Sequence, residues 1–182
     1  MVIDEVVAQL RNTSLWTSAG EKLLWRVAAS NKFEEVVNRF AAITQRERRD
    51  ANVFIVYGTL LAWSTEFSTD EIEQYRLGMQ ADKAFNAAIA IDENNWDAWM
   101  SKASFYADSG YKPWEKEAVT ILEQTITEQE KYRQKPRFVR AYIDLGKMYR
   151  ELGRVEDATE TWKRGRRFFP DNDGLQQHLN ID

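Results

Sequence analysis

Residues 142–149 read Tyr-Ile-Asp-Leu-Gly-Lys-Met-Tyr, and they are followed by Gly153, Ala158, Trp162 and Pro170. In an α-helix, residues three or four positions apart share a face, so Tyr142, Gly146 and Tyr149 line one side of a first helix. Ala158 and Trp162 in the same way share one side of a second helix. Two helices approach to about 8–10 Å only where their side chains interdigitate. The small residues Gly146 and Ala158 therefore predict a tightly packed helix pair with the aromatic rings beside them.

The order and spacing of these residues resemble the tetratricopeptide repeat, a 34-residue unit of two helices with the pattern W-x2-L-G-x2-Y…A-x3-F…P. Tyr142 stands where the pattern has its first Trp, and Trp162 stands where it has Phe. Looser copies precede this one, and they carry their small residues at Gly58, Ala81 and Ala103.

The resemblance implies an all-α fold, namely a right-handed superhelical stack of antiparallel helix pairs. We expect a TPR-like α-solenoid of about four repeats, formed by residues 1–182 as a single domain. The repeats are predicted at 17–50, 51–95, 96–138 and 139–172. Stacked repeats leave an apolar face open at each end, so capping helices are predicted at 2–15 and 173–182.

Local signals predict where several of these helices begin and end. Ser18 with Glu21, and Ser68 with Glu71, have the spacing of a capping box at a helix start. The second box predicts a long helix over about 69–91. Gly153 is placed to end a helix in the left-handed conformation.

The composition argues against catalysis and against bound cofactors or metals. The 182 residues include no Cys and one His, with 43% hydrophobic and 13% aromatic residues. Thiol chemistry and cysteine-ligated metals are therefore excluded, and His178 is interpreted as an ordinary surface residue near the C-terminus. Residues 171–174 (Asp-Asn-Asp-Gly) begin like a calcium loop, but Gln176 occupies the position that requires glycine. We expect no enzyme activity, no cofactor and no metal.

Membrane and export signals are weak. The longest uncharged run, 51–65, is shorter than the about 20 residues that a spanning helix needs. Residues 1–11 (MVIDEVVAQLR) lack the basic start of a signal peptide. We therefore expect a cytoplasmic protein without a transmembrane segment, or a periplasmic or exported protein if a signal segment was removed.

Charge is divided unevenly along the chain. The net charge is −4, but residues 131–170 alone carry +7 and the remainder −11. Within the basic part, Lys163, Arg164, Arg166 and Arg167 end a predicted helix, where cations complement the helix dipole. Two interpretations of the uneven charge remain open: solvated helix faces, which we favour, or steering of an acidic partner toward the C-terminal third.

The family resemblance implies protein binding in a concave groove lined by the first helix of each repeat. The predicted groove residues are Asn52, Ile55, Thr59, Trp63, Met100, Ser104, Arg140, Ile143, Lys147 and Arg150. The Lys/Asn clamp with which many family members hold a terminal carboxylate is absent, because apolar or hydroxyl residues stand in its places. A groove apolar in the middle and basic at one wall suits a peptide or amphipathic helix with acidic flanks. Trp63 and Met100 have an equally weighted alternative, in which another helix of the chain covers them.

Three hypotheses follow for the function. The first is a non-catalytic adaptor or scaffold that binds a protein partner. The second is self-association into a homo-oligomer through apolar helix faces. The third, least favoured by the acidic net charge, is a helical enzyme or a nucleic-acid-binding protein that uses the basic C-terminal third.

Overall fold

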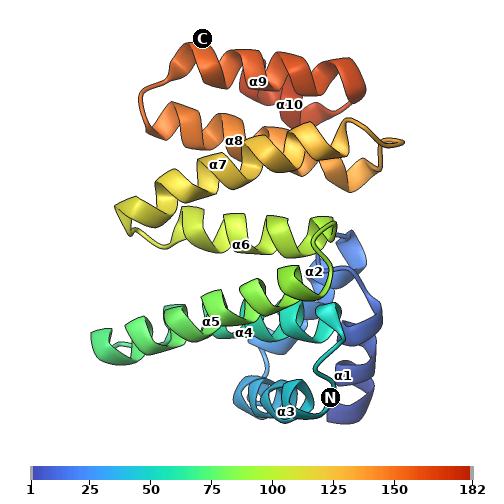
Figure 1. The fold of residues 1–182 in the computed structure, drawn as a ribbon, viewed down its shortest axis with the longest axis vertical. Coiled ribbons are helices and arrows are strands. Elements are labelled where there is room, and N and C mark those ends of the chain that lie inside the picture. Colours follow the sequence, from blue (N-terminus) through green and yellow to red (C-terminus); the bar gives the residue numbers. More distant parts are fainter. Residues whose placement is uncertain (1, 181–182) are drawn as a thin grey trace. The chain divides into compact units, whose positions relative to one another are not determined.

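The computed structural model describes residues 2–180, and all regular secondary structure in that range is helical (Figure 1). The helices are α1 (Ile3–Asn12), α2 (Ser18–Ala28), α3 (Phe33–Arg46), α4 (Ala51–Phe67), α5 (Glu71–Ile91), α6 (Trp96–Asp108), α7 (Lys112–Gln129), the 3-10 helix η1 (Pro136–Phe138), α8 (Val139–Glu151), α9 (Val155–Phe168) and α10 (Asp173–Leu179). The predicted all-α class is therefore confirmed. Met1 and residues 181–182, the end of the expected C-terminal cap, lie outside the described residues.

The helices group into two compact units, one ending at Lys102 and the other beginning at Ala103. The first unit contains α1 to α5 and the start of α6, and the second contains the end of α6 and α7 to α10. The interpretation of residues 1–182 as one domain of four repeats stays a prediction.

Each unit contains a helix pair that packs closely around a glycine. On α4, a Cβ added to Gly58 would lie 2.7 Å from Cε1 of Phe85 on α5. On α8, a Cβ added to Gly146 would lie 2.1 Å from Nε1 of Trp162 on α9. Both glycines are the eighth residue of their predicted repeat, and in both pairs an aromatic ring fills the space that the missing side chain leaves. The predicted packing of small against aromatic residues is confirmed for these two pairs.

The end of α8 also follows the sequence prediction. Gly153 has a φ of +75°, which costs glycine little. Its N–H donates to the Arg150 carbonyl at 3.0 Å, and the Arg154 N–H donates to the Tyr149 carbonyl at 2.8 Å. These two bonds form the Schellman arrangement that ends many helices.

The two predicted capping boxes are wrong, because a neighbouring side chain caps each helix. The N-cap of α2 is Thr17, whose Oγ1 accepts a hydrogen bond from the Gly20 N–H at 3.2 Å. The N-cap of α5 is Asp70, whose Oδ1 accepts from the Ile72 N–H at 2.9 Å. The Ser68 hydroxyl instead accepts from the Asp70 N–H and shapes the turn before the helix. The long helix itself is present, beginning at residue 71 instead of 69.

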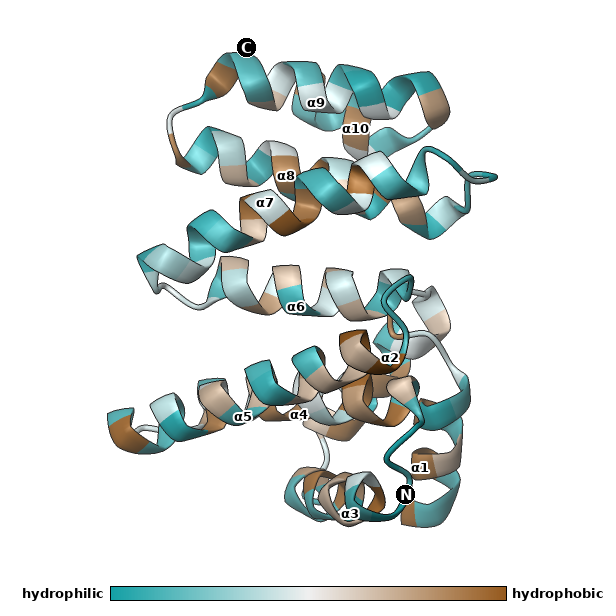
Figure 2. Cartoon of the chain, in the orientation of Figure 1, coloured by the Kyte–Doolittle hydropathy of each residue, from teal (hydrophilic) through white to brown (hydrophobic). Residues whose placement is uncertain are grey.

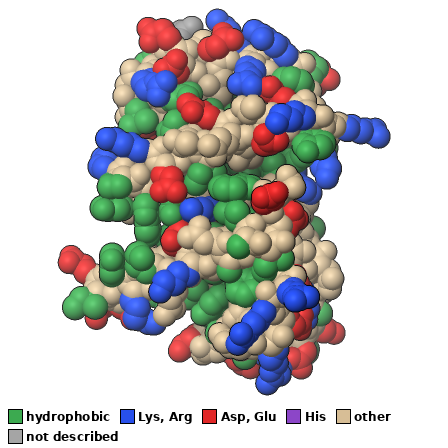
Figure 3. All heavy atoms as spheres, viewed as in Figure 1, with side chains coloured by type: hydrophobic (Ala, Val, Ile, Leu, Met, Phe, Trp, Pro, Cys, Tyr) green, Lys and Arg blue, Asp and Glu red, His purple; other side chains and the backbone are tan. Residues whose placement is uncertain are grey.

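The predicted second repeat, 51–95, is longer than the 34-residue pattern, and its additional residues lengthen its two helices. α4 has 17 residues and α5 has 21, and they run side by side (Figure 1). The end of this pair carries exposed apolar side chains on Phe67, Ile72 and Tyr75. The start of α5 accordingly includes hydrophobic residues (Figure 2), and hydrophobic side chains gather on the surface at this end (Figure 3).

In the second unit, a polar network joins three helices around a buried tyrosine. Tyr142 on α8 is fully buried, and its hydroxyl donates to Oε1 of Glu130, next to the end of α7, at 2.7 Å. Arg164 on α9 donates to both oxygens of Glu130, at 2.7 and 2.6 Å. Glu130 thereby connects α7 to α8 and α9.

Candidate functional site

The predicted groove residues on α4 and α6 divide into exposed and buried positions. Ile55 lies in the hydrophobic core of the first unit, and Met100 is fully buried. Neither side chain can contact a partner as placed, so their assignment to the groove is corrected. Ile55 belongs to a core cluster that also contains side chains of α1, α2 and α3, which its place in the repeat pattern did not indicate.

The other predicted residues on these helices keep some exposure. Asn52 is exposed, and Thr59 and Ser104 are half-buried. Trp63 is half-buried, and its ring lies 5.2 Å from that of Trp25 on α2. A second helix of the same unit therefore covers part of Trp63, in line with the alternative given for it.

The four predicted residues on α8 lie at helical spacing, and we call them the α8 stripe: Arg140, Ile143, Lys147 and Arg150. Arg140 Nε donates to both oxygens of Asp144, at 2.9 and 2.8 Å. Ile143 is half-buried, with its Cδ1 3.2 Å from where a Cβ on Gly174 of α10 would lie. The C-terminal helix thus lies against the middle of the stripe.

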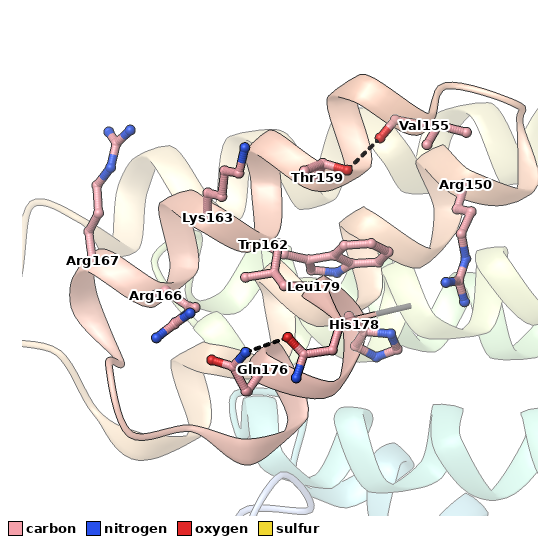
Figure 4. Close-up of a pocket in the computed structure, with 11 residues that line it drawn as sticks. Arg150, Val155, Thr159, Trp162, Lys163, Arg166, Arg167, Gln176, His178 and Leu179 are labelled. Carbon is pink, nitrogen blue, oxygen red and sulfur yellow. Dashed lines mark hydrogen bonds between the residues drawn. The ribbon is translucent and has the colours of Figure 1, made fainter. Parts of the chain in front are cut away.

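At the far end of the stripe, Arg150 borders a pocket of about 580 Å³ in the second unit. We call it the terminal pocket, and its other lining residues are Val155, Thr159, Trp162, Lys163, Arg166 and Arg167 of α9 and Gln176, His178, Leu179 and Asn180 of α10 or its end. Figure 4 shows Trp162 and His178 at its centre, with Lys163 and Arg166 on one side and Arg150 on the other. Four of the described lining residues are cations and none is acidic.

The basic cluster at the end of α9 serves two purposes. Arg164 pairs with Glu130, and Arg167 approaches Oε1 of Glu160 at 3.3 Å. Lys163 and Arg166 line the terminal pocket, and neither forms an ion pair among the described residues. The helix-dipole interpretation accounts for cations at this helix end, but it does not explain why two of them face a pocket without acidic residues.

His178 is part of the terminal pocket, so its interpretation as an ordinary surface residue is corrected. Its ring stacks on that of Trp162, with centroids 4.8 Å apart and an angle of 14° between the planes. Burial lowers the pKa of His178, and the charges of Lys147 and Arg150 lower it further. The ring Nδ1 is buried without a hydrogen-bond partner among the described residues. Burial and the neighbouring cations therefore both favour the neutral form of the His178 ring.

Sequence reasoning missed most of the terminal pocket. The signal was present on α9, where Val155, Thr159, Trp162, Lys163 and Arg166 recur at helical spacing and so share one side. What the sequence lacked was the position of α10, which contributes Gln176, His178 and Leu179 to the lining and stacks His178 on Trp162.

A solved structure has a similar fold. It is the crystal structure of a thermophilic TPR protein from Thermus thermophilus, which matches with a TM-score of 0.72. The match covers 97% of this chain and 84% of that one, at 12% sequence identity. The chain has the tetratricopeptide-repeat fold. No protein-family model matches the sequence, and no curated protein matches it either.

Within this tetratricopeptide-repeat fold, residues 2–180 hold no group of three or more His, Asp or Glu side chains arranged for a metal ion. None of the helices described is both long and apolar enough to cross a lipid bilayer.

Proposed function

We propose that the chain is a non-catalytic protein-interaction module, an adaptor or scaffold that binds a peptide or an amphipathic helix of a partner protein. The tetratricopeptide-repeat fold supports this proposal, because it presents the first helices of successive repeats as a recognition surface. The single observation that carries it is the α8 stripe. There, Lys147 and Arg150 make no ion pair with a described carboxylate, and they follow the half-buried, apolar Ile143 along one side of the helix. Such a surface complements an acidic partner with an apolar anchor.

Site-specific photo-crosslinking tests this proposal. We expect a benzoylphenylalanine at Thr59, Ser104 or Lys147 to form adducts with the same partner protein in an extract of the source cell. The matched controls carry the same replacement at the exposed residues Glu34 on α3 and Thr120 on α7. These two helices are the second helices of their predicted repeats, so they should not line the groove. No adducts at the three test positions, or equal adducts at the controls, would contradict the proposal.

A second candidate function, self-association, is favoured by the apolar end of α4 and α5. Ile72 is 81% exposed and Tyr75 72% exposed, and large exposed apolar side chains that lie together are typical of interaction sites. We expect light scattering to show a mass that rises with concentration, and Ile72→Lys with Tyr75→Lys to abolish the rise. The control is Tyr132→Lys, which changes an exposed tyrosine of the other unit. A constant monomer mass at all concentrations would exclude this candidate.

A further inference from the structure

We infer that the terminal pocket is a binding site for a short acidic segment of a partner protein, one that carries an apolar side chain between its carboxylates. This inference rests on the proposed protein-interaction function and adds a site and a partner chemistry to it. The site lies between α9 and α10, and it shares only Arg150 with the α8 stripe.

The charges of the terminal pocket favour carboxylates. Its described lining has four cations and no acidic residue, although the whole chain carries a net charge of −4. Arg164, in the same turn of α9, is neutralised by Glu130, whereas Lys163 and Arg166 have no such partner among the described residues. Unpaired cations that converge on a concave surface attract an anionic ligand and fix its orientation.

The apolar part of the terminal pocket favours a peptide over a bare anion. Val155 is 54% exposed at the start of α9, and Leu179 lines the pocket at the end of α10. The volume of about 580 Å³ falls in the usual range for ligand sites. Gln176 and Asn180 also line it, and they are hydrogen-bonded to each other at 2.7 Å. A segment with one aliphatic side chain between acidic residues matches this combination.

Single-stranded nucleic acid would also supply negative charge, but the aromatic residues do not suit it. Nucleic-acid grooves typically offer exposed aromatic faces on which bases stack. Trp162 is only 3% exposed, since His178 stacks on it and the Arg150 guanidinium lies 5.4 Å from its ring centre. No open face of Trp162 therefore remains for a base.

An NMR titration of the full chain tests the inference with a defined probe. The probe is an acetylated, amidated pentapeptide of sequence Asp-Glu-Leu-Asp-Glu, and its neutral counterpart is Asn-Gln-Leu-Asn-Gln. We expect the acidic peptide to shift the side-chain signals of Arg150, Arg166 and the Trp162 indole in a saturable way. The neutral peptide is expected to leave them unchanged.

Paired variants separate a defined site from general attraction of charge. Lys163→Glu with Arg166→Glu should weaken binding of the acidic peptide by about tenfold or more, a loss of about 1.4 kcal/mol. Arg48→Glu with Arg49→Glu changes the net charge equally at exposed residues far along the chain, and it should leave binding within about twofold. A Lys163→Gln and Arg166→Gln variant with unchanged circular dichroism guards against misfolding, and it should also weaken binding.

Three outcomes would overturn the inference. They are the absence of saturable shifts, an equal loss in both charge-reversed variants, and tighter binding of an eight-residue oligothymidylate to the same signals. Because the probe is synthetic, these outcomes are independent of the crosslinking experiment on the first helices.

Discussion

Replacing Gly146 with alanine is expected to lower the free energy of unfolding of the second unit by about 2 kcal/mol. The added Cβ would lie 2.1 Å from Nε1 and 2.3 Å from Cε2 of Trp162, so the indole must move. Trp162 cannot move freely, because it is buried, is stacked on His178 and donates to the Ile143 carbonyl at 3.4 Å. The better helix propensity of alanine, worth up to about 1 kcal/mol, offsets only part of this cost.

Urea unfolding followed by circular dichroism measures the loss, and the NMR signal of the Trp162 indole reports the displacement. Gly174→Ala is the matched control, because its Cβ would meet only the ends of side chains, at 3.2 Å. We expect this control to change the stability by less than about 0.5 kcal/mol. Wild-type stability with an unshifted Trp162 signal in Gly146→Ala would show that the close approach of α8 and α9 is not required.

A compensating change can be read from the sequence. At the positions of Gly146 and Trp162, the predicted third repeat has Ala103 and Leu122. Ala103 is larger than glycine, and Leu122 is smaller than tryptophan. We therefore expect Trp162→Leu to recover part of the stability that Gly146→Ala loses. Residues in contact show such non-additive effects, whereas distant ones do not.

The packing around Gly146 was predictable because it depends on residues close together in the sequence. Gly146 leaves space on α8, and Trp162 provides a ring on α9. Because the short turn at Gly153 joins these two helices, few other arrangements of the pair are possible. Gly58, also singled out as a small residue of a repeat, is packed in the same way, and the structure identifies Phe85 as its partner. Local patterns therefore predicted the helices and their tight pairs.

Other features depend on contacts that no local pattern contains. Ser68 and Asp70 are both residue types that can cap a helix. Asp70 occupies the N-cap position of α5, and the local sequence did not show which of the two would do so. Ile55 is buried in a core cluster to which α1, α2 and α3 contribute, and these helices lie before α4 in the chain. The terminal pocket needed the position of α10, which brings His178 onto Trp162. The candidate site was thus predicted only in part, through Arg150.

The second large effect is expected at Glu130, where Glu130→Ala should lower the free energy of unfolding by about 2–3 kcal/mol at pH 7. The change removes the acceptor of two hydrogen bonds from Arg164 and one from Tyr142. Arg164 is exposed enough to be hydrated afterwards, but the fully buried Tyr142 hydroxyl loses its acceptor. The matched control is Glu128→Ala, which breaks an exposed pair with Lys131 and should cost less than about 0.5 kcal/mol.

The pH dependence separates the charge of Glu130 from its volume. Burial raises the pKa of the Glu130 carboxyl, but hydrogen bonds from Arg164 and Tyr142 and the charge of Arg164 outweigh it, so the pKa lies below the ordinary 4.5. A carboxyl with a lowered pKa stabilises the fold fully above pH 4.5, and this stabilisation is lost as the pH falls through the lowered value. Unfolding in urea at pH 7 and near pH 3 should therefore show the gap between wild type and Glu130→Ala narrowing in acid. A gap that stays constant with pH would mean that Glu130 acts by filling space, and the Arg164 pair would then contribute little to holding α9 against α7.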